Sequence, residues 1–186
     1  MTDLENLTDE KLVELIRTQN QELYSTIIRR YQQKISHYLR KFVHNHDELE
    51  DVLQDVFIKA FRNLNDFDKS KRFSPWIYRI AHNEALNFLK KNHKQQLSLD
   101  QEDIQILDTT ADIKQSVDSI LNRTAVENAL SQIKIKFQEP LILYFFEQKS
   151  YEEISEILHI PTSTVGTLIS RGKIQLKELL KQYGKQ

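Results

Sequence analysis

The chain has 186 residues, enough for one compact domain or two small ones. Strands and tight turns usually need glycine or proline, and the chain has only three of each, so helix is the expected element. The first glycine is Gly166, which excludes an upstream glycine-rich phosphate loop, and the absence of cysteine excludes disulfides and thiol chemistry. The net charge of −1 is a sum over the whole chain, so local surfaces of either sign remain open.

The first part of the chain carries apolar residues at helical spacing in four blocks. The first block is a short helix around Leu12, with Thr8 or Asp9 as its N-cap. A longer second helix is predicted from Leu23 to Phe42, because its apolar residues recur every three or four positions.

The third block has a broad apolar stripe and an opposite polar face. The stripe comprises Leu49, Val52, Leu53, Val56, Phe57, Ala60, Phe61 and Leu64, and the polar face comprises Glu50, Asp51, Gln54 and Asp55. Ser74 followed by Pro75 predicts the start of a fourth helix, with the serine as cap and the proline at the first helical position. We therefore expect a helical bundle over residues 8–92.

Residues 93–123 are predicted to form a flexible acidic linker, because apolar residues become sparse and the local charge between positions 92 and 123 is −3. A second helical module is expected over residues 124–183. It begins with a helix through Ala129 and Ile133, and Glu139-Pro140 is expected to open the next one.

A helical pair completes the second module. A helix over 150–160, a break at Pro161 and a second helix from Thr162 have the apolar spacing of a helix-turn-helix. Residues 161–186 carry a net charge of +4, which suits DNA, although an ordinary helical hairpin fits the spacing as well. Ser155 and His159 stand where alanine and glycine are common in such turns.

A second basic tract covers residues 67–94 with a net charge of +5 and several aromatic side chains. Cations interleaved with aromatics suit single-stranded nucleic acid, because aromatics stack on bases while cations follow the backbone. We expect Trp76 and Phe88 in the core and Phe67, in a polar connection, as the aromatic available to a base.

Three ordered motifs are similar to bacterial RNA polymerase sigma factors of the sigma-70 family, extracytoplasmic-function (ECF) subfamily. They are DELEDVLQDVFIKAF at 47–61, FSPWIYRIA at 73–81, and YEEI at 151–154 with Thr164-Val165. The resemblance covers nearly the whole chain and implies an all-α fold of two small helical domains, a sigma region 2-like bundle and a sigma region 4-like helix-turn-helix domain, joined by the flexible linker.

The resemblance implies that the first module docks on the beta-prime clamp helices of core RNA polymerase and then reads and melts the minus-ten promoter element. The implied polymerase-binding residues are Glu48, Glu50, Asp51, Gln54, Asp55 and Phe57, the last as an exposed aromatic beside the acidic face. The implied minus-ten residues are Phe67, Lys69, Lys71, Arg72, Arg79, Asn83, Asn87 and Lys90.

The second module, by the same resemblance, reads the minus-thirty-five element in the major groove, and the beta flap of the polymerase is a further implied partner of the chain. The implied residues are Thr162, Ser163, Thr164, Thr167, Ser170, Arg171 and Lys173. Many relatives are held by an anti-sigma protein, so a partner of that class is compatible with the resemblance. No cofactor or metal is expected.

Two other classes of protein compete with this interpretation. His46-Asp47 with Asp51 and Asp55 is compatible with a metal-dependent phosphohydrolase, but the remaining histidines show no matching ligand set, so we expect no enzyme. A helix-turn-helix regulator without polymerase binding explains the second module but leaves the acidic face without a role. No secretory signal or apolar run of about 20 residues is visible, so we expect a soluble cytoplasmic protein without membrane insertion.

Overall fold

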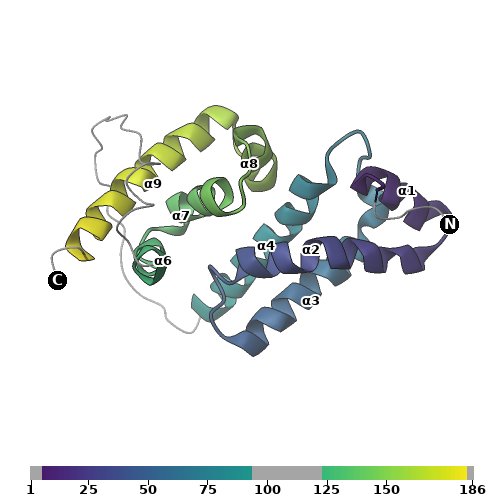
Figure 1. Cartoon of the computed structure of the whole chain (residues 1–186), viewed down its shortest axis with the longest axis horizontal. Helices are drawn as coiled ribbons and strands as arrows, with labels where there is room; N and C mark the ends of the chain where they lie inside the picture. Colours follow the sequence, from purple (N-terminus) through teal and green to yellow (C-terminus); the bar gives the residue numbers. More distant parts are fainter. Residues whose placement is uncertain (1–5, 94–122, 184–186) are drawn as a thin grey trace. The chain divides into compact units, whose positions relative to one another are not determined.

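The computed structural model describes residues 6–93 and 123–183, and in these ranges the chain forms helices and connecting turns without a strand (Figure 1). The described residues divide into two compact units, one formed mainly by the helices up to residue 93 and the other mainly by those from residue 123. The predicted all-α, two-domain fold is confirmed. The linker predicted at 93–123 lies almost wholly outside the described residues.

The first unit contains the four predicted helices with two short 3₁₀ turns. The elements are α1 (Asp9–Thr18), η1 (Gln21–Leu23), α2 (Tyr24–Leu39), α3 (His46–Arg62), η2 (Leu64–Asp66) and α4 (Phe73–His93). Its core lies where α2, α3 and α4 face one another, and α1 packs beside the connection between α3 and α4 (Figure 1). The core includes the fully buried side chains of Ile27, Ile35, Tyr38, Val56, Ala60, Ile77 and Ala81.

Polar side chains fix where these helices begin. The Thr8 hydroxyl accepts a hydrogen bond from the Lys11 amide at 3.3 Å, which confirms Thr8 as the cap of α1. The Asn45 side chain caps α3 by accepting from the amides of residues 47 and 48. The predicted cap Ser74 is wrong, because α4 already begins at Phe73, whose amide donates instead to the Glu10 carboxylate at 2.9 Å.

Within residues 123–183 the second unit contains five helical elements. They are α6 (Arg123–Ser131), α7 (Ile135–Leu141), the π-helical turn η3 (Ile142–Phe146), α8 (Tyr151–Leu158) and α9 (Thr162–Tyr183). The prediction that Glu139-Pro140 opens a helix is wrong: Pro140 lies inside α7, and both residues are buried. The helix starts earlier because Phe137 and Leu141, four positions apart, present one buried face, and the missing proline amide falls just before the wider π turn.

The helix-turn-helix is built from two local motifs around α8. At its start, the Ser150 hydroxyl accepts from the Glu153 amide at 3.2 Å while the Glu153 carboxylate accepts from the Ser150 amide at 2.9 Å, a capping box. At its end, His159 adopts a left-handed φ of 59°, and the Ile160 amide donates to the Ser155 carbonyl at 3.2 Å, a Schellman turn. The Ser155 hydroxyl also donates to the Ile160 carbonyl at 2.6 Å, so Ser155 and His159 both fit the turn.

Gly172 marks the closest approach of α7 and α9. A Cβ at this position would lie 2.8 Å from Leu141 Cδ1 and 3.0 Å from the carbonyl oxygen of Phe137, and this backbone atom is not free to move aside. At Gly166, in the same helix, the nearest atom to an added Cβ is Tyr151 Cε2 at 3.4 Å, an ordinary contact. Close packing against α7 therefore accounts for glycine at 172 but not at 166.

We predict that Gly172→Ala destabilises the second unit by about 1–3 kcal/mol, because overpacking exceeds the gain in helix propensity. The matched variant Gly166→Ala, also within α9, gains propensity without the clash and is neutral or more stable. Native-state hydrogen exchange of the α7 and α9 amides in the full-length chain measures both effects. Equal protection of these amides in the two variants contradicts the prediction.

Candidate functional site

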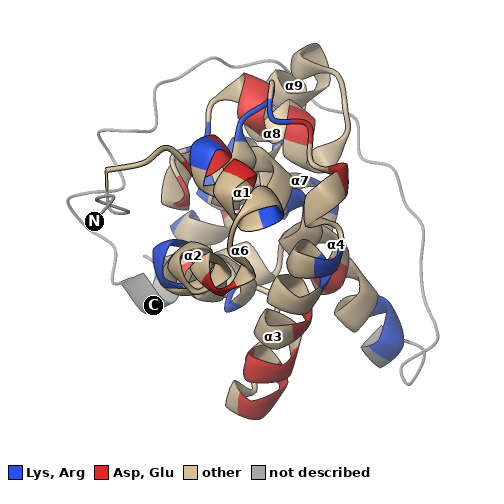
Figure 2. Cartoon of the chain, turned by 90° about the vertical axis from the view of Figure 1, so that its right-hand side faces the viewer, with Lys and Arg blue, Asp and Glu red and all other residues tan. Residues whose placement is uncertain are grey.

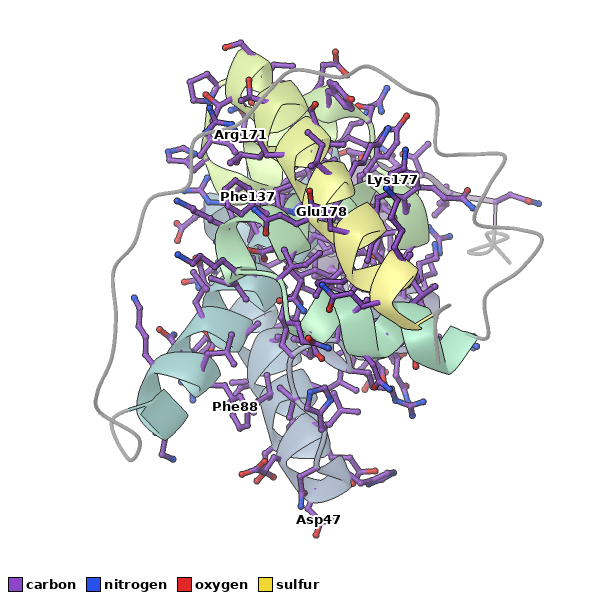
Figure 3. The ribbon with its side chains drawn as sticks, turned by 90° about the vertical axis from the view of Figure 1, so that its left-hand side faces the viewer. Asp47, Phe88, Phe137, Arg171, Lys177 and Glu178 are labelled. Carbon is purple, nitrogen blue, oxygen red and sulfur yellow. The ribbon has the colours of Figure 1, made fainter. Side chains whose placement is uncertain are left out.

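An acidic face runs along the exposed side of α3. It consists of Asp47, Glu48, Glu50, Asp51, Gln54 and Asp55, all exposed. The face begins at the N-terminal end of the helix, where Figure 3 labels Asp47, and Figure 2 shows the Asp and Glu positions in red along the α3 ribbon. Carboxylates in the first turn, beside the positive end of the helix dipole, also stabilise the helix. Five of the six predicted polymerase-binding residues lie on this face.

The sixth predicted residue, Phe57, is not the exposed aromatic of this surface. Its side chain is 8% exposed and belongs to the core, and its carbonyl accepts from the hydroxyl of buried Tyr24 at 2.7 Å. The large apolar side chains that α3 does expose are Ile58 (39%) and Phe61 (40%), although Phe61 was predicted for the buried stripe. Ile58 follows Asp51 by seven positions and Asp55 by three, the spacing that places it on the acidic face.

A basic and polar face runs along α4. Arg79, Asn83, Asn87 and Lys90 are all exposed, and their spacing of four, four and three positions places them on one side of the helix. The structure therefore brings four of the predicted minus-ten residues together. Trp76 and Phe88, predicted for the core, are partly buried.

The buried carboxylate of Glu84 contacts one residue of this face and one residue of α3. Glu84 is 8% exposed, and its Oε2 atom lies 2.6 Å from Nζ of Lys59 on α3. Its other oxygen accepts from the side-chain amide of Asn87 at 3.4 Å. The ion pair thus links α3 to α4, and it also orients one of the polar groups on the exposed side of α4.

The connection between α3 and α4 places the remaining minus-ten candidates. The prediction that Phe67 is available to a base is wrong for this structure: its side chain is 3% exposed, and its ring packs 5.4 Å from that of Phe73 and 5.3 Å from that of Trp76. The polar neighbours of Phe67 suggested exposure, but the ring closes the end of the core. Lys69, Lys71 and Arg72 are exposed.

Lys69 is engaged with α1. Its Nζ atom lies 3.1 Å from Oε1 of Glu14, whose Oε2 atom pairs with Lys11 at 2.8 Å. Hydrogen bonds from Lys11 and then Lys69 lower the pKa of Glu14 to about 2. The carboxylate is therefore charged at neutral pH, and the loop cation is held beside α1.

The first half of α9 carries the predicted minus-thirty-five residues. Thr162, Ser163, Thr167 and Arg171 are exposed, whereas Thr164 and Ser170 are partly buried. Thr162, Ser163 and Thr164 belong to the first turn of α9, and the amides of a first helical turn readily bind phosphate oxygens. Figure 3 labels Arg171 further along α9.

Lys173 is separated from this group. It follows Arg171 by two positions, about 200° around the helix. Its Nζ atom lies 5.3 Å from the ring centroid of Phe145 and 5.9 Å from that of Tyr144, both partly buried. This cation thus rests against an aromatic pair, away from the side that carries Arg171.

The described residues contain neither a cluster of metal-ion ligands nor a membrane-spanning helix. Among the residues that the structure describes, no three His, Asp or Glu side chains gather in a way that would hold a metal ion. The Nδ1 atom of His46 lies 3.5 Å from Oε1 of Glu50 and 4.0 Å from Oδ1 of Asp47, and these exposed side chains do not form such a group. No helix within 6–93 or 123–183 is long and apolar enough to cross a membrane.

Family models match both units. The model for Sigma-70 region 2 matches residues 27–95, and the model for Sigma-70, region 4 matches residues 123–176. The ECF RNA polymerase sigma factor SigW of Bacillus subtilis (strain 168) is 31% identical over 180 residues, covering 92% of this chain and 96% of SigW. The ECF RNA polymerase sigma-E factor of Escherichia coli (strain K12) is 30% identical over 177 residues, covering 91% of this chain and 92% of the relative.

Solved structures show the same fold. CnrH in complex with the cytosolic domain of CnrY has a TM-score of 0.70 at 20% identity, covering 94% of this chain and 97% of CnrH. RpoE of Bartonella quintana in complex with the anti-sigma factor NepR has a TM-score of 0.66 at 20% identity, covering 85% of this chain and 96% of RpoE. Since relatives at 30% identity or more extend over 91% or more of its length, the chain belongs to the ECF sigma factors of the sigma-70 family.

Proposed function

We propose that this sigma factor binds core RNA polymerase through α3, opens the minus-ten element with α4 and its preceding loop, and reads the minus-thirty-five element with α9. As an ECF sigma factor the chain directs promoter-specific transcription initiation. The assignment of each step to a surface rests on the exposure and charge of the residues described above. The two modules, 8–92 and 124–183, divide these tasks between them, and residues 93–123 join them.

The observation that carries the polymerase-binding step is the combination of charge and apolar surface on α3. Carboxylates of the acidic face steer a basic partner toward the helix, which mainly raises the association rate. Ile58 and Phe61, 39% and 40% exposed, supply apolar anchors of the kind that provide most of the affinity at an interface. The clamp helices of the beta-prime subunit are the proposed partner of this surface, and the beta flap is the proposed partner of the second module.

Promoter opening is assigned to the polar face of α4. Arg79 and Lys90 follow a phosphate backbone, while Asn83 and Asn87 offer amide donors and acceptors to the edges of unstacked bases. Unstacking a base costs a few kcal/mol, which such contacts offset without nucleotide hydrolysis. Exposed Lys69, Lys71 and Arg72 extend the positive surface into the loop before α4.

The minus-thirty-five step is assigned to the first half of α9. Thr162, Ser163 and Thr164 lie at the helix N-terminus, where hydroxyls and amides bind phosphates and fix the register on duplex DNA. Thr167, Ser170 and Arg171 follow within the next turns and are the proposed base-reading residues. Lys173, held against Phe145, is reassigned from base reading to supporting the packing of α9.

The alternative of a helix-turn-helix regulator without polymerase is not favoured, because it leaves the acidic face and the exposed Ile58 and Phe61 without a partner. We propose that the chain acts by binding and not by catalysing a reaction, and that it works in the cytoplasm beside the polymerase. RpoE of B. quintana is bound to an anti-sigma factor in its solved structure, and a protein of that class is a proposed regulator of this chain too.

Reversing one charge on the acidic face tests the polymerase-binding step. We expect Asp51→Lys to weaken binding to purified core polymerase at least about tenfold, or about 1.4 kcal/mol, because a cation then faces the basic partner. The control Glu22→Lys makes the same charge change at an exposed position in η1 and leaves affinity within about twofold. Fluorescence anisotropy with core polymerase measures both, and unchanged affinity of Asp51→Lys contradicts the proposal.

Separate variants on α4 and α9 test the division between opening and duplex reading. We expect Arg171→Ala to weaken binding to minus-thirty-five duplex by about 1–3 kcal/mol, whereas Asn83→Ala leaves this binding unchanged and lowers permanganate reactivity of minus-ten thymines in holoenzyme complexes. Lys136→Ala, at an exposed position on α7, serves as a charge control for Arg171→Ala. If the α4 and α9 variants reduce both readouts equally, the division is incorrect.

A further inference from the structure

One face of α1 holds the connection between α3 and α4 at three points. Glu10, Glu14 and Arg17 follow each other at spacings of four and three, so they share one side of the helix. Arg17 contacts the start of the connection, Glu14 contacts its middle through Lys69, and Glu10 accepts from the Phe73 amide at its end. The motifs that identify the family begin at residue 47 and leave this helix without a role.

Arg17 makes the most extensive of these contacts. Its Nε atom donates to the Leu64 carbonyl at 2.8 Å, and its Nη2 atom donates to the same oxygen and to the Phe67 carbonyl at 2.6 Å. The guanidinium carbon also lies 5.9 Å from the centroid of the Phe67 ring. One side chain therefore binds the carbonyls at both ends of η2 and covers the ring that turns inward.

These contacts determine which loop side chains face outward. Both carbonyls are bound and the Phe67 ring packs on Phe73 and Trp76, so the backbone from residue 64 to residue 67 is fixed against the core. Lys71 and Arg72 are then exposed just before α4 begins. A loop without these anchors loses this arrangement, because each ordered residue costs about 1–2 kcal/mol of backbone entropy.

We propose that Arg17 is a positioning residue for promoter opening: from α1, it holds the loop at 64–72 in the shape that presents its cations to the unstacked minus-ten strand. This inference rests on the proposed function of that loop. Arg17 itself contacts protein carbonyls, so it acts through the loop and not as a DNA ligand.

The planar fork of arginine is required for this role. It donates to two carbonyls in fixed directions, whereas the ammonium of lysine is a compact charge on a flexible stem. Arg17→Lys therefore keeps the charge and most of the stem but loses the bridge between the two carbonyls. Arg29→Lys is a matched control, because Arg29 is an exposed arginine on α2 whose guanidinium donates to Thr26 one turn away at 3.1 Å.

The test uses the full-length chain with core polymerase on a duplex promoter. We expect Arg17→Lys to lower permanganate reactivity of the minus-ten thymines and affinity for a minus-ten single-stranded oligonucleotide about tenfold. Core polymerase affinity and minus-thirty-five duplex binding stay at wild-type values, and the midpoint of thermal unfolding falls by only a few degrees, because the lost hydrogen bonds are confined to the loop. Hydrogen exchange rises at the amides of 64–72 and not elsewhere, and Arg29→Lys behaves as the wild type in every measurement.

Two results overturn the inference. The first is wild-type promoter opening by Arg17→Lys in spite of faster exchange in the loop. The second is a loss of core polymerase binding in the same proportion as opening, which assigns α1 a purely structural role; hydrogen exchange over the whole first unit detects this even for a variant that folds poorly. Failure of the wild-type chain to bind core polymerase contradicts the proposed function itself. This outcome is distinct from the two above, because both compare Arg17→Lys with a wild-type chain that binds.

Discussion

The ion pair between Lys59 and Glu84 is the interaction on which the arrangement of the first unit depends. It joins α3 to α4 with an N–O distance of 2.6 Å, and the carboxylate is buried. The Glu84 side chain is 9% exposed and the Lys59 side chain 45% exposed, so loss of the lysine leaves a buried acceptor without its charged partner, at a cost of about 1–3 kcal/mol. Since α3 carries the acidic face and α4 carries the basic one, this contact and the apolar core beneath it hold two surfaces of opposite charge on adjacent helices.

This separation of charge explains how a nearly neutral chain can bind both an anionic partner and a partner with a basic surface. The net charge of −1 combines carboxylates on one side of α3 with cations on α4, its preceding loop and α9. Figure 2 shows a run of red along α3 and a blue segment at the end of α4. Opposite charges placed on different helix faces do not cancel at the contact distances of a partner, because ionic screening limits each field to about 8–10 Å.

Short-range patterns in the sequence predicted much of this fold. The Thr8 cap and the break at Pro161 between α8 and α9 depend on neighbours within a few positions, so they were visible without a structure. Phe57 and Phe67 were misplaced for the opposite reason. Whether an aromatic ring on a helix or in a polar loop is buried depends on how other elements pack around it, here α2 for Phe57, and both α1 and the first turn of α4 for Phe67. The clasp formed by Glu10, Glu14 and Arg17 was missed because each of its contacts joins residues more than 45 positions apart.

The turn between α8 and α9 has a further consequence for how this protein tolerates change. Its left-handed position is occupied by His159, and the Ser155 hydroxyl bonds the carbonyl of the residue that follows. Glycine at 159 would relax the folded turn but also enlarge the freedom of the unfolded chain, so the two effects oppose each other. The hydroxyl then matters most when a side chain occupies 159. Because residues 155 and 159 belong to one hydrogen-bonded turn, we expect the effects of changes at the two sites not to add.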